Sequence, residues 1–336
     1  MTTDDINKKL NKRAAYISLL GGIIILTTKF VAYFITDSTA IFSDATESII
    51  NIVASGVALA SIIISAKPAD KDHPYGHGKI EYFSAGFEGL LIAIAGIVII
   101  YSGIVKIIIG ATPSKLGVGM ILLGITAVMN LALSAYIMRI GKKTKSLTLI
   151  ADAKHVLADV YTSTGIIAGL VVVMFTGITV FDPIIAILVA LNILVTGYKL
   201  VREAIGGLMN EVDCKTMRMI ARKIITIRKT EWIDIHELRF WKSANNIFID
   251  FHMVLPYYFT IKEAHKSDEI ILHELNKVLP GTQVKIHLDY CDYELCKYCE
   301  YAECKERHEN FSVKTEWNLT RLTGKGIRKL NGLKEP

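Results

Sequence analysis

Long apolar stretches fill the first two thirds of the chain, whereas the last third is built of shorter apolar and polar runs. Six of the apolar stretches reach the length of about 20 residues that a helix needs to cross about 30 Å of hydrocarbon. The pattern therefore predicts an all-α membrane bundle of six transmembrane helices. Their predicted ranges are 14–35, 40–66, 82–109, 116–140, 147–175 and 180–200.

The last third has the pattern of one small α/β domain. Apolar residues recur at helical spacing, as at Met217, Ile220 and Ile224, and alternate with polar residues in the predicted strands. The order α-β-β-α-β favours helices on one face of a small sheet. The predicted elements are a helix at 213–228, strands at 232–241 and 246–255 around Ser243-Ala244-Asn245, a helix at 261–279 and a strand at 283–289. The tail after 290 is polar, with a weak helix near its end.

Charge is spread unevenly over the 336 residues. Only 24 Asp, Glu, Lys and Arg residues fall between 14 and 205, and 40 fall between 206 and 336. This distribution excludes a single soluble globule, a disordered chain and a fibrous repeat. The net charge is +6, but no basic stripe interleaved with aromatic residues is present, so nucleic-acid binding has no support.

Basic residues indicate the orientation of the predicted bundle. Lys115 is the only Lys or Arg in the connections at 36–39, 110–115 and 176–179. The segments at the other end of the predicted bundle hold many Lys and Arg residues. The positive-inside rule then places both termini in the cytoplasm. The apolar run after the Lys-rich N-terminus is too long for a cleavable signal peptide. We expect a cytoplasmic segment at 1–13, a transport domain at 14–205, a cytoplasmic α/β domain at 206–290 and a tail at 291–336.

Polar trios of matched spacing interrupt two of the predicted spans. Positions 0, +3 and +7 share one helix face, and ionisable groups at mid-depth usually mark a pathway or a site. Oxygen and imidazole ligands in such a place suit a divalent cation, and pairs at i and i+4 reach one ion from each helix. The alternative is that these groups only join the helices by hydrogen bonds. The predicted ligands are Glu47, Asn51, His155 and Asp159, with Asp44 and Asp152 as a vestibule or second layer.

A loop between the second and third spans holds a further candidate metal site. His73 and His77 stand at i and i+4, and Asp70 is close in sequence. Two imidazoles and a carboxylate can bind zinc. Alternatively, the glycines and the proline of this segment only shape a structured loop.

Two candidate sites lie in the last third of the chain. His287 and Asp289 alternate with apolar residues on a predicted strand, so both leave its apolar face, and His252 does the same on another strand. The tail has Cys-x4-Cys-x2-Cys-x4-Cys spacing, which favours a metal site over disulfides in a reducing compartment. The alternative is a disordered tail with free thiols. These cysteines are Cys291, Cys296, Cys299 and Cys304.

Together these residues resemble the cation diffusion facilitator family. The resemblance rests on the span count, the two polar trios, His-Pro-Tyr-Gly-His-Gly-Lys at 73–79 and Ile-His-Leu-Asp at 286–289. It implies a six-helix metal transporter with a cytoplasmic ferredoxin-like domain that works as a homodimer. It also implies metal-responsive ligands in that domain. The matching positions are His236, His252, His265, His287 and Asp289.

The family's transport site takes two ligands from the second span and two from the fifth. Zinc-transporting members usually have Asp or His and then Asp on the second span, where this chain has Glu47 and Asn51. One anionic ligand is thus replaced by a neutral oxygen, which puts the identity of the metal in doubt. The loop residues Asp70, His73 and His77 match a further family position.

The predicted function is a proton-coupled antiporter that exports a divalent transition metal from the cytoplasm. We expect Zn²⁺ first and Mn, Fe, Co or Cd as alternatives, with metal ions as substrate and regulator and no prosthetic group. We expect no catalytic residues, and an integral protein of a bacterial plasma membrane. The alternative is a membrane-anchored metal sensor that signals through its cytoplasmic domain, but a sensor has no need of ligands at mid-depth.

Overall fold

The chain forms two compact units, a helical unit up to Met209 and an α/β unit from Asn210 onwards. The computed structural model describes residues 3–36, 39–109, 118–178, 180–244, 246–330 and 332. The predicted connections at 36–39, 110–115 and 176–179, the start of the fourth predicted span and Asn245 of the hairpin lie wholly or partly outside these residues.

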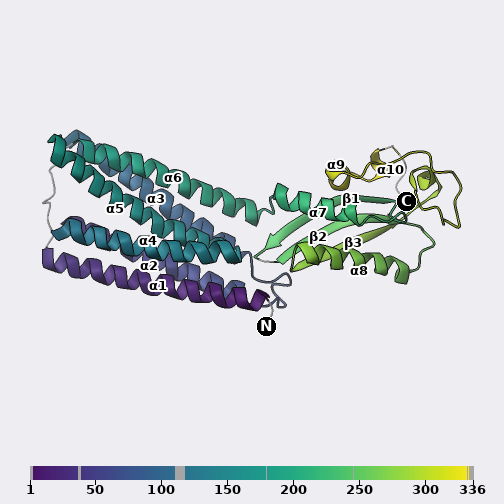
Figure 1. Ribbon diagram of the computed structural model, residues 1–336, viewed down its shortest axis with the longest axis horizontal. Helices are drawn as coiled ribbons and strands as arrows, with labels where there is room; N and C mark the ends of the chain where they lie inside the picture. Colours follow the sequence, from purple (N-terminus) through teal and green to yellow (C-terminus); the bar gives the residue numbers. More distant parts are fainter. Residues whose placement is uncertain are drawn as a thin grey trace. The chain divides into compact units, whose positions relative to one another are not determined.

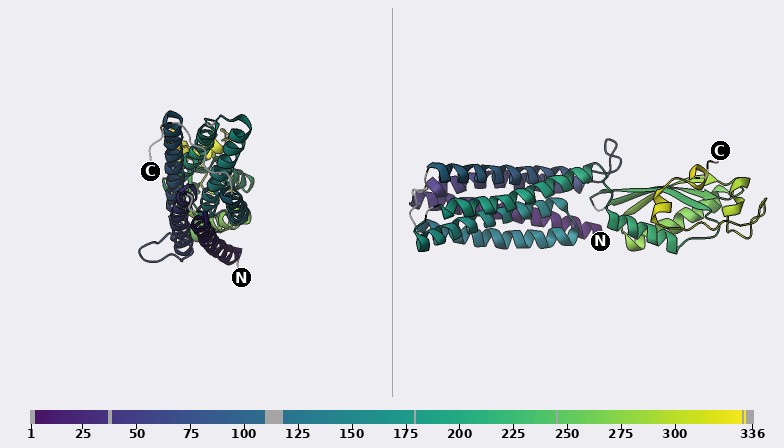
Figure 2. Two further views of the ribbon diagram at one scale, coloured as in Figure 1. Left: turned by 90° about the vertical axis from the view of Figure 1, so that its left-hand side faces the viewer. Right: turned by 90° about the horizontal axis from the view of Figure 1, so that it is seen from above.

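Six long helices run side by side in the helical unit (Figure 1), and Figure 2 shows them end-on. The fifth helix contacts each of the other five, so it lies at the centre of the bundle. The helices are α1 (Thr3–Thr36), α2 (Thr39–Ser65), α3 (Ile80–Ile109), α4 (Val118–Thr144), α5 (Leu147–Thr176) and α6 (Phe181–Leu208).

Four of these helices contain segments that are long and apolar enough to cross a membrane, within the described residues. The segments are Ile6–Val31, Ile80–Ile109, Gly124–Thr144 and Pro183–Leu208. The other two helices, α2 and α5, carry the polar trios, and α2 keeps a shorter apolar segment at Asn51–Ser65. The two helices with the polar groups are packed within the same bundle.

Small residues let α3 and α6 approach closely. A Cβ atom at Gly197 of α6 would lie 2.7 Å from the carbonyl oxygen of Gly89 and 2.8 Å from the backbone nitrogen of Ala93, both on α3. Gly96 and Gly103 follow Gly89 on α3 at intervals of seven residues and also face α6. Close backbone approach of this kind favours helix association in a membrane.

The α/β unit contains one three-stranded sheet in the order β1-β2-β3. Strands β1 and β2 are antiparallel, and β2 and β3 are parallel. The observed element order is the predicted α-β-β-α-β, followed by three short helices in the tail. The elements are α7 (Cys214–Thr226), β1 (Asp234–Ser243), β2 (Asn246–Leu255), α8 (Ile261–Val278), β3 (Thr282–Tyr290), η1 (Tyr293–Tyr298), α9 (Leu319–Thr323) and α10 (Ile327–Leu330).

The two faces of the sheet are covered differently. Alternate residues of β2, such as Phe251 and Met253, join the core that α7 and α8 form on one face. Val254 points to the other face, where it packs with Leu295 of η1 and Ile327 of α10. A residue of β2 in the same alternation as Val254 therefore lies on the face that the tail partly covers.

Candidate metal sites

One polar network joins α2 to α5 inside the helical unit. The Nε2 atom of His155 lies 2.7 Å from the Oδ1 atom of Asn51. The Nδ2 group of Asn51 donates a hydrogen bond to Asp159. Because the amide nitrogen faces the carboxylate, the amide oxygen faces His155 and accepts a hydrogen from its Nε2 atom. The structure thus brings together three of the four predicted transport ligands.

The fourth predicted ligand, Glu47, and the outer Asp44 lie on α2, but their side chains are outside what the structure describes. The outer acid of α5, Asp152, is fully buried and accepts a hydrogen bond of 2.9 Å from the Oγ atom of Ser55. Sequence reasoning missed Ser55, because a serine in an apolar span gives no signal of its own. Asp152 therefore joins α5 to α2 through a second polar contact.

Two acidic residues on α3 were also not predicted from the sequence. Glu81 accepts hydrogen bonds from Ser65 at 2.8 Å and Ser146 at 2.7 Å, so it joins α3 to neighbouring segments. Glu88 is fully buried, and both its carboxylate oxygens lack a hydrogen-bond partner within the described residues. The signal was present, because Glu88 is an ionisable residue inside a predicted span.

The loop group assembles as a compact set of ligand atoms. Asp70, His73 and His77 offer ligand atoms that all lie within 4.8 Å of one another. Asp70 lies 3.2 Å from Nδ1 of His73 and 3.3 Å from Nε2 of His77. The backbone N–H of His73 donates to Asp70 at 2.7 Å, and this bond keeps the pKa of the carboxyl below its usual range. The Asp70 carboxyl is therefore ionised at neutral pH, as a metal ligand must be.

Strand register explains the histidine group of the α/β unit. His236, His252 and His287 are direct neighbours across β1, β2 and β3. Neighbouring strand positions place their side chains about 5 Å apart, so three imidazoles form one row. The rings of His252 and His287 lie 4.5 Å apart between centroids.

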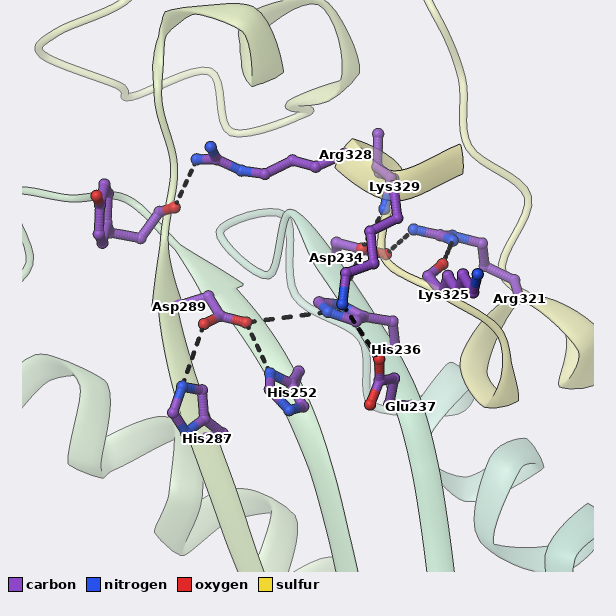
Figure 3. Close-up of polar contacts among 12 residues, drawn as sticks. Asp234, His236, Glu237, His252, His287, Asp289, Arg321, Lys325, Arg328 and Lys329 are labelled. Carbon is purple, nitrogen blue, oxygen red and sulfur yellow. Dashed lines mark hydrogen bonds and ion pairs between the residues drawn. The ribbon is translucent and has the colours of Figure 1, made fainter. Parts of the chain in front are cut away.

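Asp289 lies beside this row and faces all three histidines (Figure 3). Its carboxylate is 3.0 Å from Nδ1 of His252, 3.4 Å from Nε2 of His287 and 3.9 Å from Nε2 of His236. The ligand atoms of His236, His252 and Asp289 lie within 4.8 Å of one another. We call these three residues and His287 the sheet cluster.

A buried carboxylate that the sequence did not reveal supports the sheet cluster. Asp234 lies 3.1 Å from Nδ1 of His236 and 2.5 Å from Nη2 of Arg321. It also accepts a hydrogen bond of 3.0 Å from the backbone nitrogen of Ile327. Its contact at Nδ1 leaves Nε2 of His236 directed towards Asp289, as Figure 3 shows.

The cluster borders a cleft of about 260 Å³ that the tail helps to line through Gly326, Arg328 and Lys329. The structure does not bring His265 to the cluster within the described part of the chain. That side chain is 63% exposed on α8 and lies 3.7 Å from Asp268 and 3.6 Å from Glu269.

The four tail cysteines gather around one small cavity. Cys291 directly follows the last residue of β3, and Cys296 lies in η1. Cys299 and Cys304 come after η1, and all four cysteines line the cavity. All four are free thiols. Burial raises the pKa of the Cys291 thiol to about 11 and also raises that of Cys299. Without an ion these two sulfurs therefore carry their protons at neutral pH.

Two family models match the chain over these two units. Residues 15–209 match the model described as "Cation efflux transmembrane domain", and residues 215–291 match "Cation efflux protein, cytoplasmic domain". The first match alone covers more than half of the chain. The chain belongs to the cation diffusion facilitator family. The predicted resemblance is confirmed, and the segment after 291 lies beyond both matched regions of this family member.

Several known transporters align with this chain over most of their length. This cation diffusion facilitator is 31% identical over 281 residues to the uncharacterized transporter sll1263 of Synechocystis, covering 84% of this chain and 91% of that protein. It is 26% identical to the cation-efflux pump FieF of Serratia proteamaculans, covering 84% of this chain and 94% of FieF. It is 27% identical to the manganese efflux system protein MneP of Bacillus subtilis, covering 84% of this chain and 97% of MneP.

Proposed function

We propose that this protein exports a divalent transition-metal cation from the cytoplasm in exchange for protons. The network of Asn51, His155 and Asp159 between α2 and α5 carries the proposal. Placing polar groups in hydrocarbon costs on the order of 2.5–3.5 kcal/mol for each charge at mid-depth, so a cluster of them suits an ion path. The names of FieF and MneP, a cation-efflux pump and a manganese efflux protein, support the same reaction.

The ligand types define a range of metals. An amide oxygen, an imidazole nitrogen and a carboxylate, with Glu47 as the fourth ligand, suit Zn²⁺ and also Mn²⁺, Fe²⁺, Co²⁺ or Cd²⁺. Two carboxylates balance the charge of one divalent ion. Asn51 contributes an oxygen without charge, which weakens the preference for zinc that a second-span aspartate would give.

Protons and metal compete for the same atoms in the proposed cycle. A metal ligand must offer a lone pair, so His155 must be neutral and Asp159 ionised when the ion binds. In the network without metal, Nε2 of His155 bears a hydrogen that points at Asn51. The metal ion needs the lone pair of this nitrogen, so a protonated His155 gives its Nε2 proton to water on the cytoplasmic side and keeps the hydrogen on Nδ1. Proton uptake from the outer side then releases the ion again.

Regulation and assembly complete the proposal. The distribution of basic residues supports a cytoplasmic location for both termini and, with them, the α/β unit. Two copies of the chain work together, and metal bound at the sheet cluster draws their α/β units closer as the cytosolic concentration rises. The loop group of Asp70, His73 and His77 binds metal on the same side of the membrane. His265 remains a predicted ligand in this regulatory step.

Proton flux driven by metal in proteoliposomes tests the proposal. A zinc gradient should move protons across vesicles that contain the full-length protein and enclose a pH-sensitive dye. The double variant His155→Ala, Asp159→Ala should abolish the flux. Asn192→Ala changes an exposed residue of α6 and should retain it. Repeating the assay with Mn²⁺, Fe²⁺, Co²⁺ and Cd²⁺ identifies the substrate.

Two outcomes would contradict the proposal. Undiminished flux in the double variant would mean that the network is only a joint between helices. Metal binding by the α/β unit, without flux of any tested ion, would favour the sensor instead.

A further inference from the structure

The tail beyond β3 has little regular structure to hold it in place. Between Tyr290 and the start of α9 at Leu319, the structure has only the short helix η1. Its apolar contacts join Leu295 and Tyr298 to Val254 of the sheet, and Trp317 packs against the core of the α/β unit. A segment with so small a core needs a cross-link to offset its conformational entropy.

The four cysteines meet where such a cross-link would act. Their residues line one cavity of about 10 Å³, which has room for a single ion but not for an organic ligand. Four cysteines from one segment, spaced x4, x2 and x4, thus border one small cavity.

Two hydrogen bonds hold the segment around the last cysteine. The backbone N–H of Lys305, which follows Cys304, donates to the hydroxyl of Tyr258 at 3.3 Å, and Tyr258 lines the same cavity as the four cysteines. The backbone N–H of Cys304 donates to the carbonyl oxygen of Tyr301 at 3.3 Å.

Arg307 fixes the turn that carries the middle cysteines. Its guanidinium donates to the carbonyl oxygens of Cys296 at 3.4 Å, Cys299 at 3.1 Å and Tyr301 at 2.7 Å. A positive charge beside the cavity offsets part of the excess negative charge that four thiolates and a divalent ion would leave. The backbone of the turn is therefore held in one shape around the thiols.

We propose that Cys291, Cys296, Cys299 and Cys304 bind one zinc ion as a closed, tetrahedral and structural site. Four thiolates leave no open position, so the ion stays resident and is not transported. Among the described residues, the groups with ligand atoms within 4.8 Å of one another are the loop group and the sheet cluster, not these thiols. The ion would therefore draw the four sulfur atoms together and release their protons.

The site would stabilise the cleft beside the sheet cluster. Asp292 follows Cys291 directly, caps η1 through the backbone nitrogen of Leu295, and lies 2.6 Å from Nη1 of Arg328. Arg328 belongs to α10, which lines the cleft next to His236. The zinc site thereby anchors the segment that covers one side of the sheet cluster.

Zinc content and thiol spectroscopy of the full-length protein test this site. Cys214 is an exposed thiol outside the tail, so Cys214→Ser is the matched control. Wild-type protein and Cys214→Ser, purified in reductant, should each retain one more zinc per chain than the double variant Cys296→Ser, Cys299→Ser. Equal zinc in all three proteins would overturn the proposal.

A second measurement needs no tail variant and keeps the proposal testable if that variant fails to fold. Wild-type protein loaded with Co²⁺ should show the thiolate-to-metal charge-transfer band of a tetrahedral site, and Cys214→Ser should show the same band. The transport site, the loop group and the sheet cluster contain no sulfur, so the band reports the tail alone, whether or not the protein transports metal. Absence of the band, or disulfides among these cysteines, would refute the site.

Discussion

At the scale of single residues, Asp234 shows how one buried carboxylate orients a candidate metal ligand. It contacts His236, Arg321 and the backbone of Ile327 at once. A carboxylate beside Nδ1 favours the ring orientation in which Nε2 faces Asp289. The geometry of the sheet cluster therefore depends on a residue outside the cluster.

Replacing this carboxylate should weaken the cluster. Asp234→Asn is expected to lower zinc affinity at the sheet cluster by about 10- to 100-fold, because His236 loses its charged partner. Calorimetric titration of the full-length protein carrying His155→Ala and Asp159→Ala measures this affinity with the transport site removed. Asp268→Asn, which removes a neighbour of the exposed His265, is the control. Equal affinities in the two variants would show that Asp234 serves only the tail.

The sequence predicted all four members of this cluster, with His236 through the family resemblance, but not the carboxylate of Asp234 beside it. His252, His287 and Asp289 follow from the two-residue period of strands, which a local pattern reveals. Asp234 could not be recognised, because its partners Arg321 and Ile327 lie 87 and 93 residues further along the chain. Such a contact depends on how the tail folds back onto the sheet.

At the scale of elements, apolar periodicity predicted where helices and strands lie. It did not predict where a strand departs from regular pairing. Strand β2 has the predicted bounds, and α8 ends one residue before the predicted helix. The bulge of β1 between His236 and Arg239 was not predicted. There Glu237 has a positive φ of 52° and its backbone nitrogen donates to Gly324 of the tail. The acceptor of this backbone nitrogen lies in the distant tail, so no local sequence signal marks the bulge.

The contact between α3 and α6 should tolerate no side chain at Gly197. Gly197→Ala is expected to destabilise the protein by about 1–3 kcal/mol, because its Cβ would meet rigid backbone atoms of Gly89 and Ala93. Thermal unfolding in detergent measures the change. Gly124→Ala is the control, since no atom lies within 4 Å of its added Cβ, and there alanine should be neutral or stabilising. An equal response of both variants would exclude close packing as the cause.

A pair of lysines should make α8 sensitive to acid. Hydrogen bonds from Lys223 of α7 and Lys277 lower the pKa of Glu274 to about 2, against about 4.3 in an unfolded chain. A lowered pKa stabilises the fold above about pH 4.3, and this contribution is lost as the pH falls towards 2. Wild-type protein should therefore unfold at a higher temperature than Glu274→Gln at pH 6, with a gap that closes below pH 4. Lys223→Met should reduce the gap, and a gap independent of pH would contradict the assignment.

At the scale of the whole molecule, the two units carry two separate sets of candidate metal ligands. The helical unit holds the network of Asn51, His155 and Asp159, and the α/β unit holds the sheet cluster. The division into spans and a polar domain followed directly from the distribution of charge. The role of each unit did not, because the same ligand types serve a moving ion and a resident one.

Tryptophan fluorescence can separate the two units in the intact protein, because all three tryptophans, Trp232, Trp241 and Trp317, belong to the α/β unit. The variant His155→Ala, Asp159→Ala should lose proton flux but keep the zinc-induced change in fluorescence. The variant His252→Ala, Asp289→Ala should keep flux but lose the fluorescence change and the activation by metal on the cytoplasmic side. Paired flux and fluorescence titrations measure both responses. If either variant lost both responses together, the two ligand sets would form a single functional site, and the proposed separation of transport from regulation would be wrong.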